Sequence, residues 1–421
     1  MIDAAVRRLT TFHRAADGLA ADAALYGLSA VFALVTALTS TLLPHRAWGA
    51  VAAWAYLGAL LVTAWWWARH RRTGRGALTL LAWLGTALLP LMIQAVQRSG
   101  GRADRAQEEV VVVEEAGARL LDTGTPYLGP DAIAALPPGE QLLGYFPYQP
   151  GMAVFGLPRA IAGTAWWTDA RVWFAVATAA VLGAAVAVLR TRAEGHDHSP
   201  TVRAVQFATV LPVCALTLAT GGDDLPVLAL CLLALSCCAT DRFGAAGVAV
   251  GAAAATKLFA FPIVVVLAVL ALTCGRGRRF LAGAVGLPVL VLLPTFAVDA
   301  DAFLENVIRF PLGEGLVTSP AQSPFPGRLI SAYLPGGRYV AAGLLAAAAV
   351  AIAVRVVRRP PRTAVSAALI SGYGLLAAIL LVPSTRFGYL LYPLALLVWA
   401  PALAVPATAT APADAHTQVL R

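Results

Sequence analysis

The feature that most constrains this chain is a succession of apolar runs, each about 20 residues long. The first run, from Ala23 to Leu43, contains no charged residue. A helix of about 20 apolar residues spans the hydrocarbon core of a bilayer, and this run is too long for the core of a signal peptide, which predicts an uncleaved signal-anchor. Only 13% of the 421 residues are charged and the mean hydropathy is +0.74. A chain with this few charged residues has too little polar surface to cover a water-soluble globule. The bilayer must therefore be its solvent.

The pattern predicts an all-α polytopic membrane protein with about 10–12 transmembrane helices. The expected spans cover residues 22–43, 48–67, 77–96, 171–189, 204–220, 225–239, 280–298, 338–354, 363–382 and 389–405. Residues 1–405 are expected to form a single integral membrane domain, located in the plasma membrane. The tail 406–421 is rich in Ala, Pro and Thr, which predicts disorder.

Basic residues cluster between the apolar runs and indicate the topology. The net charge is +9, and 14 of the 30 Arg residues lie in segments 69–75, 190–203, 276–279 and 355–362. The positive-inside rule places these segments in the cytoplasm. Both termini are then cytoplasmic, whereas the loops 97–170 and 299–337 are extracytoplasmic. This arrangement explains the positive charge without nucleic-acid binding.

The run 244–274 is too long for one straight span and too short for two. Arg residues at both of its ends predict that both ends are cytoplasmic. A hairpin of two short helices that turns near Lys257 and Pro262 satisfies both conditions. The backbone at such a turn must be buried in protein or line a cavity.

The cysteines and histidines show no spacing typical of a metal site. Four of the five cysteines lie inside apolar runs and Cys274 lies at the end of one, which predicts reduced, buried thiols. His196 and His198 fall in a polar loop, for which a solvated surface is the simpler interpretation. We expect no metal and no cofactor, with a divalent cation at Asp223–Asp224 as the alternative.

The first long loop contains the most informative segment. Residues 106–122 have the pattern of an amphipathic surface helix that Gly124 ends, although the four consecutive valines also permit a short strand. Glu109 falls just beyond the third predicted span. A carboxylate held there, away from bulk water, could take a proton from a sugar hydroxyl. The competing interpretation is that these glutamates form the solvated face of the helix.

Aromatic and acidic side chains outside this helix are candidates for contacts with a sugar. Tyr145 and Tyr148 lie in the segment GYFPYQP, where rings and prolines form either stacking surfaces or an ordinary interfacial belt. Asp223 and Asp224 form a tight turn between two spans. They bind a sugar hydroxyl or a cation, or they only end two helices.

Three basic side chains are candidates for binding a lipid phosphate. Lys257 is the only lysine in the chain and lies in an apolar hairpin, where a charge is costly and suggests function. Arg386 lies in a short outer turn, and an arginine fork matches phosphate oxygens. Arg328, in the second outer loop, is a weaker candidate. We expect Lys257→Met to leave the protein folded and to weaken donor use.

The segments EAGARLLDTGTPYL, FPYQP, GGDD, AAATKLFAFP and PSTRFGYLLYPL together resemble the multi-span glycosyltransferases of the C-type fold that use polyprenyl-phosphate sugars. The similarity is greatest to glycosyltransferase family 87, the actinobacterial mannosyltransferase-like proteins. The resemblance implies surface helices in the first loop, an inverting transfer and a catalytic carboxylate where that loop starts. The family usually has aspartate there. Glu109 matches the position, with Glu108 and Glu114 as alternatives, and Tyr127 joins the sugar-binding candidates.

The sequence therefore predicts a membrane hexosyltransferase of the cell envelope. It would move a sugar, with mannose preferred, from a polyprenyl-phosphate donor to a hydroxyl of a lipid or glycan acceptor on the extracytoplasmic face. The alternatives are a flippase for lipid-linked sugars and a non-catalytic assembly factor. A flippase needs charged residues through both leaflets, whereas the polar groups here gather on one side.

Overall fold

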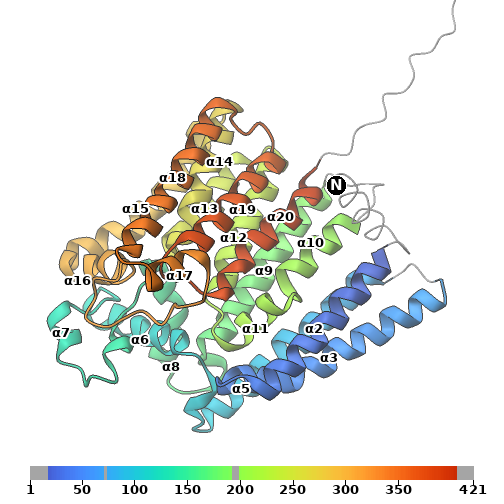
Figure 1. The fold of residues 1–421 in the computed structure, drawn as a ribbon, viewed down its shortest axis with the longest axis horizontal. Helices are drawn as coiled ribbons and strands as arrows, with labels where there is room; N and C mark the ends of the chain where they lie inside the picture. The colour runs from blue at the N-terminus through green and yellow to red at the C-terminus, as the bar shows by residue number, and fades with distance from the viewer. Residues whose placement is uncertain (1–17, 71–73, 192–198, 405–421) are drawn as a thin grey trace, which may run out of the picture.

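The computed structural model describes residues 18–70, 74–191 and 199–404, which form an assembly of α-helices (Figure 1). Apart from one isolated bridge between Gln322 and Thr385, all regular secondary structure in these ranges is helical. The all-α prediction is therefore confirmed. The tail 406–421 and the residues His196 and His198 lie outside the described ranges.

The N-terminal half of the chain contains three long helical spans, a loop of short helices, and a fourth span. The elements are α2 (Leu19–Thr39), α3 (Leu43–Ala68), α4 (Arg75–Trp83), the π-helix η2 (Leu84–Leu88), α5 (Leu89–Ser99), α6 (Glu108–Thr123), α7 (Pro130–Ala134), η5 (Pro150–Gly156), α8 (Leu157–Ala162) and α9 (Ala170–Arg190). Elements α4, η2 and α5 follow one another directly and form a single span from Arg75 to Ser99.

The C-terminal half continues with shorter helices and then three more long ones. They are α10 (Ser199–Thr209), α11 (Pro212–Thr220), α12 (Asp224–Ala239), α13 (Phe243–Thr256), α14 (Phe261–Thr273), α15 (Gly277–Val298), α16 (Ala300–Leu304), α17 (Pro326–Tyr333), α18 (Gly337–Arg358), α19 (Ala364–Leu381), the short η9 (Phe387–Leu390) and α20 (Leu391–Leu403).

The spans agree with a protein that crosses a membrane many times. In the described ranges, seven helices are long and apolar enough to cross a bilayer, and four further apolar helices are shorter. The predicted span 204–220 is bent by 44° between α10 and α11. The bend precedes Pro212, which cannot donate the backbone hydrogen bond that would continue the first helix.

Buried charges show which helix ends lie together. Asp22 near the start of α2 contacts Arg75 at the start of α4 and Arg203 near the start of α10, with both nitrogen–oxygen distances at 2.6 Å. At the other end, Arg98 of α5 contacts Glu114 of α6 and Asp169, which precedes α9. The starts of α2, α4 and α10 therefore share one end, as the alternation of spans requires.

The segment 243–276 is a hairpin, as the sequence predicts. Gly247 of α13 packs against the backbone at Phe280, and Gly251 packs against Gly283 and Ala284 of α15. Because the residue numbers rise together, α13 and α15 run parallel, so α14 must return the chain between them. The two parallel helices approach closely because these glycines have no Cβ.

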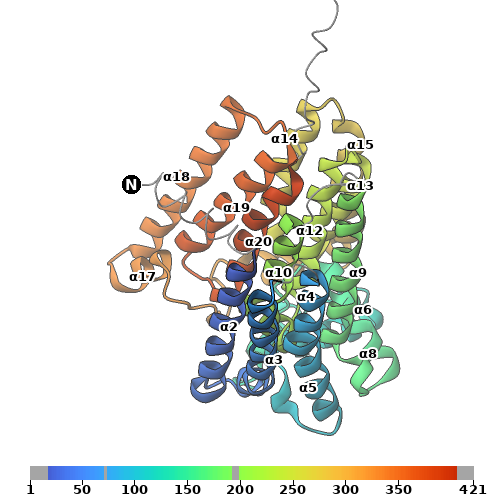
Figure 2. The same ribbon diagram turned by 90° about the vertical axis from the view of Figure 1, so that its right-hand side faces the viewer.

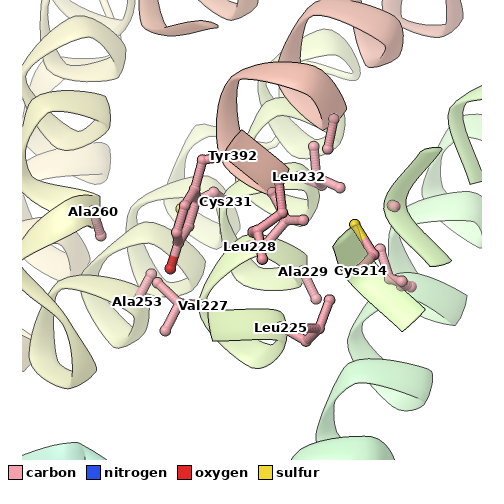
Figure 3. Close-up of a cluster of buried hydrophobic side chains, with 14 of the residues drawn as sticks. Cys214, Leu225, Val227, Leu228, Ala229, Cys231, Leu232, Ala253, Ala260 and Tyr392 are labelled. Carbon is pink, nitrogen blue, oxygen red and sulfur yellow. The ribbon is translucent and has the colours of Figure 1, made fainter. Parts of the chain in front are cut away.

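Helix α12 forms the centre of the core and is buried along nearly its whole length. It contacts α9, α11, α13, α14, α19 and α20. Figure 3 shows its side chains Leu225, Leu228 and Leu232 between Tyr392 of α20 and Cys214 of α11. Four cysteines are buried and free, as predicted, whereas Cys274 is exposed in the turn after α14.

The first long loop folds onto one end of the bundle, where α6 and α8 lie below α9, α13 and α15 (Figures 1 and 2). Residues 108–123 are helical, and Gly124 ends α6 with a φ of 77°. Gly117 and Gly156 let α6 and the segment η5–α8 approach until their backbones touch, at Leu157 and at Val113. The helical conformation of residues 108–123 confirms the predicted helix rather than the strand. The backbone contact fixes the position of α6.

Candidate functional site

An ion pair between Glu109 and Arg386 joins a segment of the first long loop to the turn between α19 and α20. Glu109 is the second residue of α6, and Arg386 directly precedes η9. Arg386 Nη1 contacts Glu109 Oε1, and the side chains retain 34% and 15% of their exposure. A carboxylate in the first turn of a helix is also favoured by the helix dipole. Both charges can therefore meet a ligand.

The position of Glu109 is set by hydrogen bonds from the residues just before it. The backbone N–H of Gln107 donates to Thr220 O at 3.0 Å, and Thr220 Oγ1 donates to Gln107 Oε1 at 3.1 Å. The buried Arg171 uses Nη1 to donate to Arg105 O at 2.7 Å and to Ala219 O at 3.1 Å. These bonds tie the start of α6 to the end of α11, directly before the Gly221–Asp224 turn.

The second part of the site is a buried cluster of one lysine and two aspartates. Lys257 Nζ lies 2.6 Å from Asp223 Oδ2 and 2.6 Å from Asp224 Oδ1. The hydroxyl of Tyr392 donates to Asp224 Oδ1 at 2.7 Å. The three charged side chains keep only 6–7% of their exposure. The aspartates thus do more than end two helices, because they neutralise the only lysine.

The turn of the α13–α14 hairpin carries Lys257 to this position. The N–H of Gln149 donates to Thr256 O at 3.1 Å, and a Cβ on Gly151 would lie 2.6 Å from Ala255 O. The segment FPYQP therefore rests on the hairpin turn. It places the ring of Tyr148 5.0 Å from Lys257 Nζ, a distance that permits a cation–π interaction.

Arg386 is held by a contact between two loops. The N–H of Ser323 donates to Thr385 O, the N–H of Thr385 donates to Ala321 O, and the N–H of Phe387 donates to Ser323 Oγ, all at 2.9 Å. Arg328 reaches the same contact through Gln322, to which it donates at 3.0 Å. The second outer loop and the Arg386 turn are therefore one structural unit.

Lys257, which the sequence predicts to serve the lipid phosphate, is paired with Asp223 and Asp224 in the structure. Its ammonium group is already balanced by two carboxylates and is almost inaccessible. A divalent cation between Asp223 and Asp224, the alternative to a site without metal, would have to take the place of this ammonium group. In the described ranges, no group of three or more His, Cys, Asp and Glu side chains is arranged to hold a metal ion.

Glu114, the alternative base, lies in a different environment from Glu109. Its carboxylate is bound by Arg98 at 2.7 Å, by Arg159 at 3.0 Å and by the backbone N–H of Ala170 at 3.1 Å. Each oxygen accepts more than one of these bonds. A carboxylate saturated in this way holds α6 against α5, α8 and α9, whereas the carboxylate of Glu109 keeps 15% of its exposure beside Arg386.

Two of the tyrosines predicted to contact a sugar use their hydroxyls within the protein. Tyr127 donates to Tyr148 O at 2.9 Å. Tyr145 lies in a separate apolar cluster, stacked on Phe310 with ring centroids 4.1 Å apart, and donates to Glu305 at 2.9 Å. Among the predicted tyrosines, Tyr148 alone reaches Lys257 and the two aspartates.

The buried network of Arg98, Asp169 and Arg171 was not predicted from the sequence. Burial by itself raises the pKa of Asp169. The guanidinium groups of Arg171 and Arg98 outweigh this effect and lower the pKa to about 2. A signal was available, since Arg98 and Arg171 stand at the outer ends of spans, where the positive-inside rule disfavours arginine. Their function is to fasten the first loop to the helices that carry the site.

Comparison with known proteins identifies one family. Residues 146–383, more than half of the chain, match the model of glycosyltransferase family 87. The matched range includes Tyr148, Asp223, Asp224 and Lys257, whereas Glu109 and Arg386 lie outside it. No curated protein matches the chain.

Two solved structures resemble the fold at low identity. They are crystal structures of ArnT from Cupriavidus metallidurans, in the apo state and bound to undecaprenyl phosphate. Their identities are 19% and 17%, with TM-scores of 0.44 and 0.46. The matches cover 70% and 77% of this chain, and 54% and 59% of the ArnT chains, so this chain spans little more than half their length.

Proposed function

The chain belongs to glycosyltransferase family 87, and on that premise we propose that it is a membrane glycosyltransferase that uses a polyprenyl-phosphate sugar as donor. The donor enters from the bilayer and meets the acceptor on the extracytoplasmic face of the plasma membrane. We propose mannose as the sugar and a lipid or glycan hydroxyl of the cell envelope as the acceptor. Both choices come from the family resemblance of the sequence motifs.

The observation that supports this function is the meeting of Glu109 and Arg386 at an accessible edge of the protein. A glycosyl transfer from a lipid phosphate needs one group that accepts a proton and another that stabilises an oxyanion. A carboxylate supplies the first and a guanidinium supplies the second. The two side chains come from segments that the tertiary structure brings together.

The transfer follows from these roles. Glu109 takes the proton of the acceptor hydroxyl while the acceptor oxygen attacks the anomeric carbon from the face opposite the phosphate. The bond from that carbon to the phosphate oxygen breaks, and its electron pair stays on the leaving phosphate. Arg386 stabilises the negative charge that grows there. The anomeric configuration is therefore inverted.

The buried cluster of Lys257, Asp223 and Asp224 has a structural role in the site. The oxygens of Asp223 and Asp224 are bound by Lys257, and those of Asp224 also by Tyr392, so they have little capacity for a sugar. We propose that this cluster of Lys257, Asp223 and Asp224 fixes the Gly221–Asp224 turn beside Gln107. The rings of Tyr148 and Tyr389 lie over the lysine, with their centroids 5.0 and 5.6 Å from Lys257 Nζ.

The test is turnover of the purified protein with polyprenyl-phosphate mannose, measured as release of polyprenyl phosphate and formation of glycosylated acceptor. Loss of a positioned base costs about 10²–10⁴ in rate, and we expect that loss in Glu109→Gln. Glu108→Gln is the matched control, because this exposed neighbour carries the same charge and should turn over normally. Normal turnover of Glu109→Gln would reject Glu109 as the base.

The same preparation separates the alternatives. A flippase moves the lipid-linked sugar across a vesicle membrane without releasing polyprenyl phosphate. A non-catalytic assembly factor does neither. Either result with the wild-type protein would overturn the proposed function.

A further inference from the structure

The ion pair between Glu109 and Arg386 links the proposed base to the proposed phosphate-binding group. We propose that this pair is the resting state of the site, and that the donor phosphate takes Arg386 away from Glu109 and so frees the carboxylate to act as base. This inference rests on the proposed function and adds a regulation to it: the base is activated by occupancy of the donor site.

Lys257, the other candidate for binding the phosphate, is already paired with two carboxylates. Lys257 contacts two carboxylates at 2.6 Å and keeps 7% of its exposure. Arg386 contacts one carboxylate and keeps 34%. A phosphate that approaches from the membrane surface therefore finds the guanidinium of Arg386 accessible, whereas reaching Lys257 would require two buried aspartates to be left without their cation.

The geometry of the ion pair permits this exchange. Arg386 and Glu109 meet in a partly exposed position, where their side chains keep 34% and 15% of their exposure. Such pairs are weak. A phosphate offers several oxygens to the planar fork and can form two parallel charge-assisted bonds. Exchange of this weak, partly exposed carboxylate contact for a forked phosphate contact is therefore favourable.

The local charge also favours the exchange. Glu109, Asp223 and Asp224 carry three negative charges, and Lys257 and Arg386 carry two positive charges. A donor phosphodiester brings one more negative charge. A carboxylate and a phosphate that shared one guanidinium would repel each other across a short distance, so arrival of the phosphate favours separation of Glu109 from Arg386.

The exchange has a chemical consequence. A carboxylate paired with a guanidinium is a weaker base than one without it, because the positive charge favours its ionised form. Release of Glu109 strengthens it when the donor is in place. The carboxylate then takes the acceptor proton, and the broken carbon–oxygen bond leaves its electron pair on the phosphate held by Arg386. When the phosphate departs, Glu109 returns its proton to water and pairs with Arg386 again.

Equilibrium binding of farnesyl phosphate to the full-length protein in detergent tests this exchange, with farnesol as the uncharged control ligand. If Glu109 competes for Arg386, Glu109→Gln should bind farnesyl phosphate about 5-fold more tightly, the factor expected for the loss of one exposed ion pair. Glu109→Ala should do the same. Glu108→Gln should bind like the wild type, and farnesol binding should be unaffected in all variants.

A double-mutant cycle identifies the partner of the competition. In an Arg386→Gln background, Glu109→Gln should no longer tighten binding, because the contested guanidinium is gone. Equal tightening in both backgrounds would show general charge repulsion and overturn the exchange. Unchanged or weaker binding by Glu109→Gln and Glu109→Ala would overturn it too. Turnover is measured separately from binding. If Glu109→Gln is inactive but binds farnesyl phosphate like the wild type, Glu109 remains the proposed base and only the proposed regulation is refuted.

Discussion

Replacement of Lys257 by methionine should destabilise the protein strongly. The ammonium group lies 2.6 Å from each of two buried carboxylates, so its removal leaves two negative charges close together without a counter-ion. At a separation of about 5 Å and an effective dielectric constant of about 20, their repulsion is about 3 kcal/mol. Removal of one partner of a buried ion pair typically costs about 3–5 kcal/mol. We expect a decrease of this size in the free energy of unfolding.

The measurement is denaturant or thermal unfolding of the purified protein in detergent, with two further variants for comparison. Asp224→Asn leaves one aspartate paired with Lys257 and should cost less than Lys257→Met. The triple variant Lys257→Met, Asp223→Asn, Asp224→Asn has no buried charge left in the cluster. It should regain most of the lost stability, because neutral replacements of buried ion pairs are often tolerated.

The reasoning would be refuted if Lys257→Met unfolded like the wild type, or if the triple variant were no more stable than Lys257→Met. The first result would mean that the carboxylates reach solvent or take up protons easily. It would also restore the simpler expectation from the sequence, in which Lys257 is dispensable for folding and serves only the donor.

Three further predictions concern the phosphate contact, the packing of α6 against the η5–α8 segment, and the membrane topology. Arg386→Lys should bind farnesyl phosphate more weakly than the wild type, because lysine cannot form the forked contact; equal affinity would argue against a bidentate phosphate. Gly156→Ala should lower the free energy of unfolding by about 1–3 kcal/mol and reduce turnover, since its Cβ would collide with the backbone of Val113 and displace α6. Gly139→Ala, which has open space around it, is the matched control, and equal behaviour of both variants would contradict the contact. A cysteine at Gly139 should react with a membrane-impermeant maleimide in intact cells, whereas the exposed Cys274 should react only after permeabilisation; the reverse pattern would invert the topology.

The sequence by itself determined the membrane character, most of the spans, the surface helix and the hairpin. Each of these follows from local rules. A run of apolar residues must be helical in a bilayer because its backbone has no water to bond, and basic clusters fix the side on which each loop lies. Gly124 marks the end of α6 because glycine readily adopts the left-handed conformation found there. Lys257 stood out because a charge in an apolar segment is costly.

Only the tertiary structure decided which charges pair. Glu109 and Glu114 are five residues apart on one helix and look alike in sequence, yet one meets Arg386 and the other is enclosed by Arg98 and Arg159. Lys257, read from the sequence as a phosphate ligand, instead has two aspartates as partners. The physical reason is that helical periodicity fixes the direction of a side chain, whereas its counter-ion depends on which helix ends pack together, and contacts between distant segments set that packing.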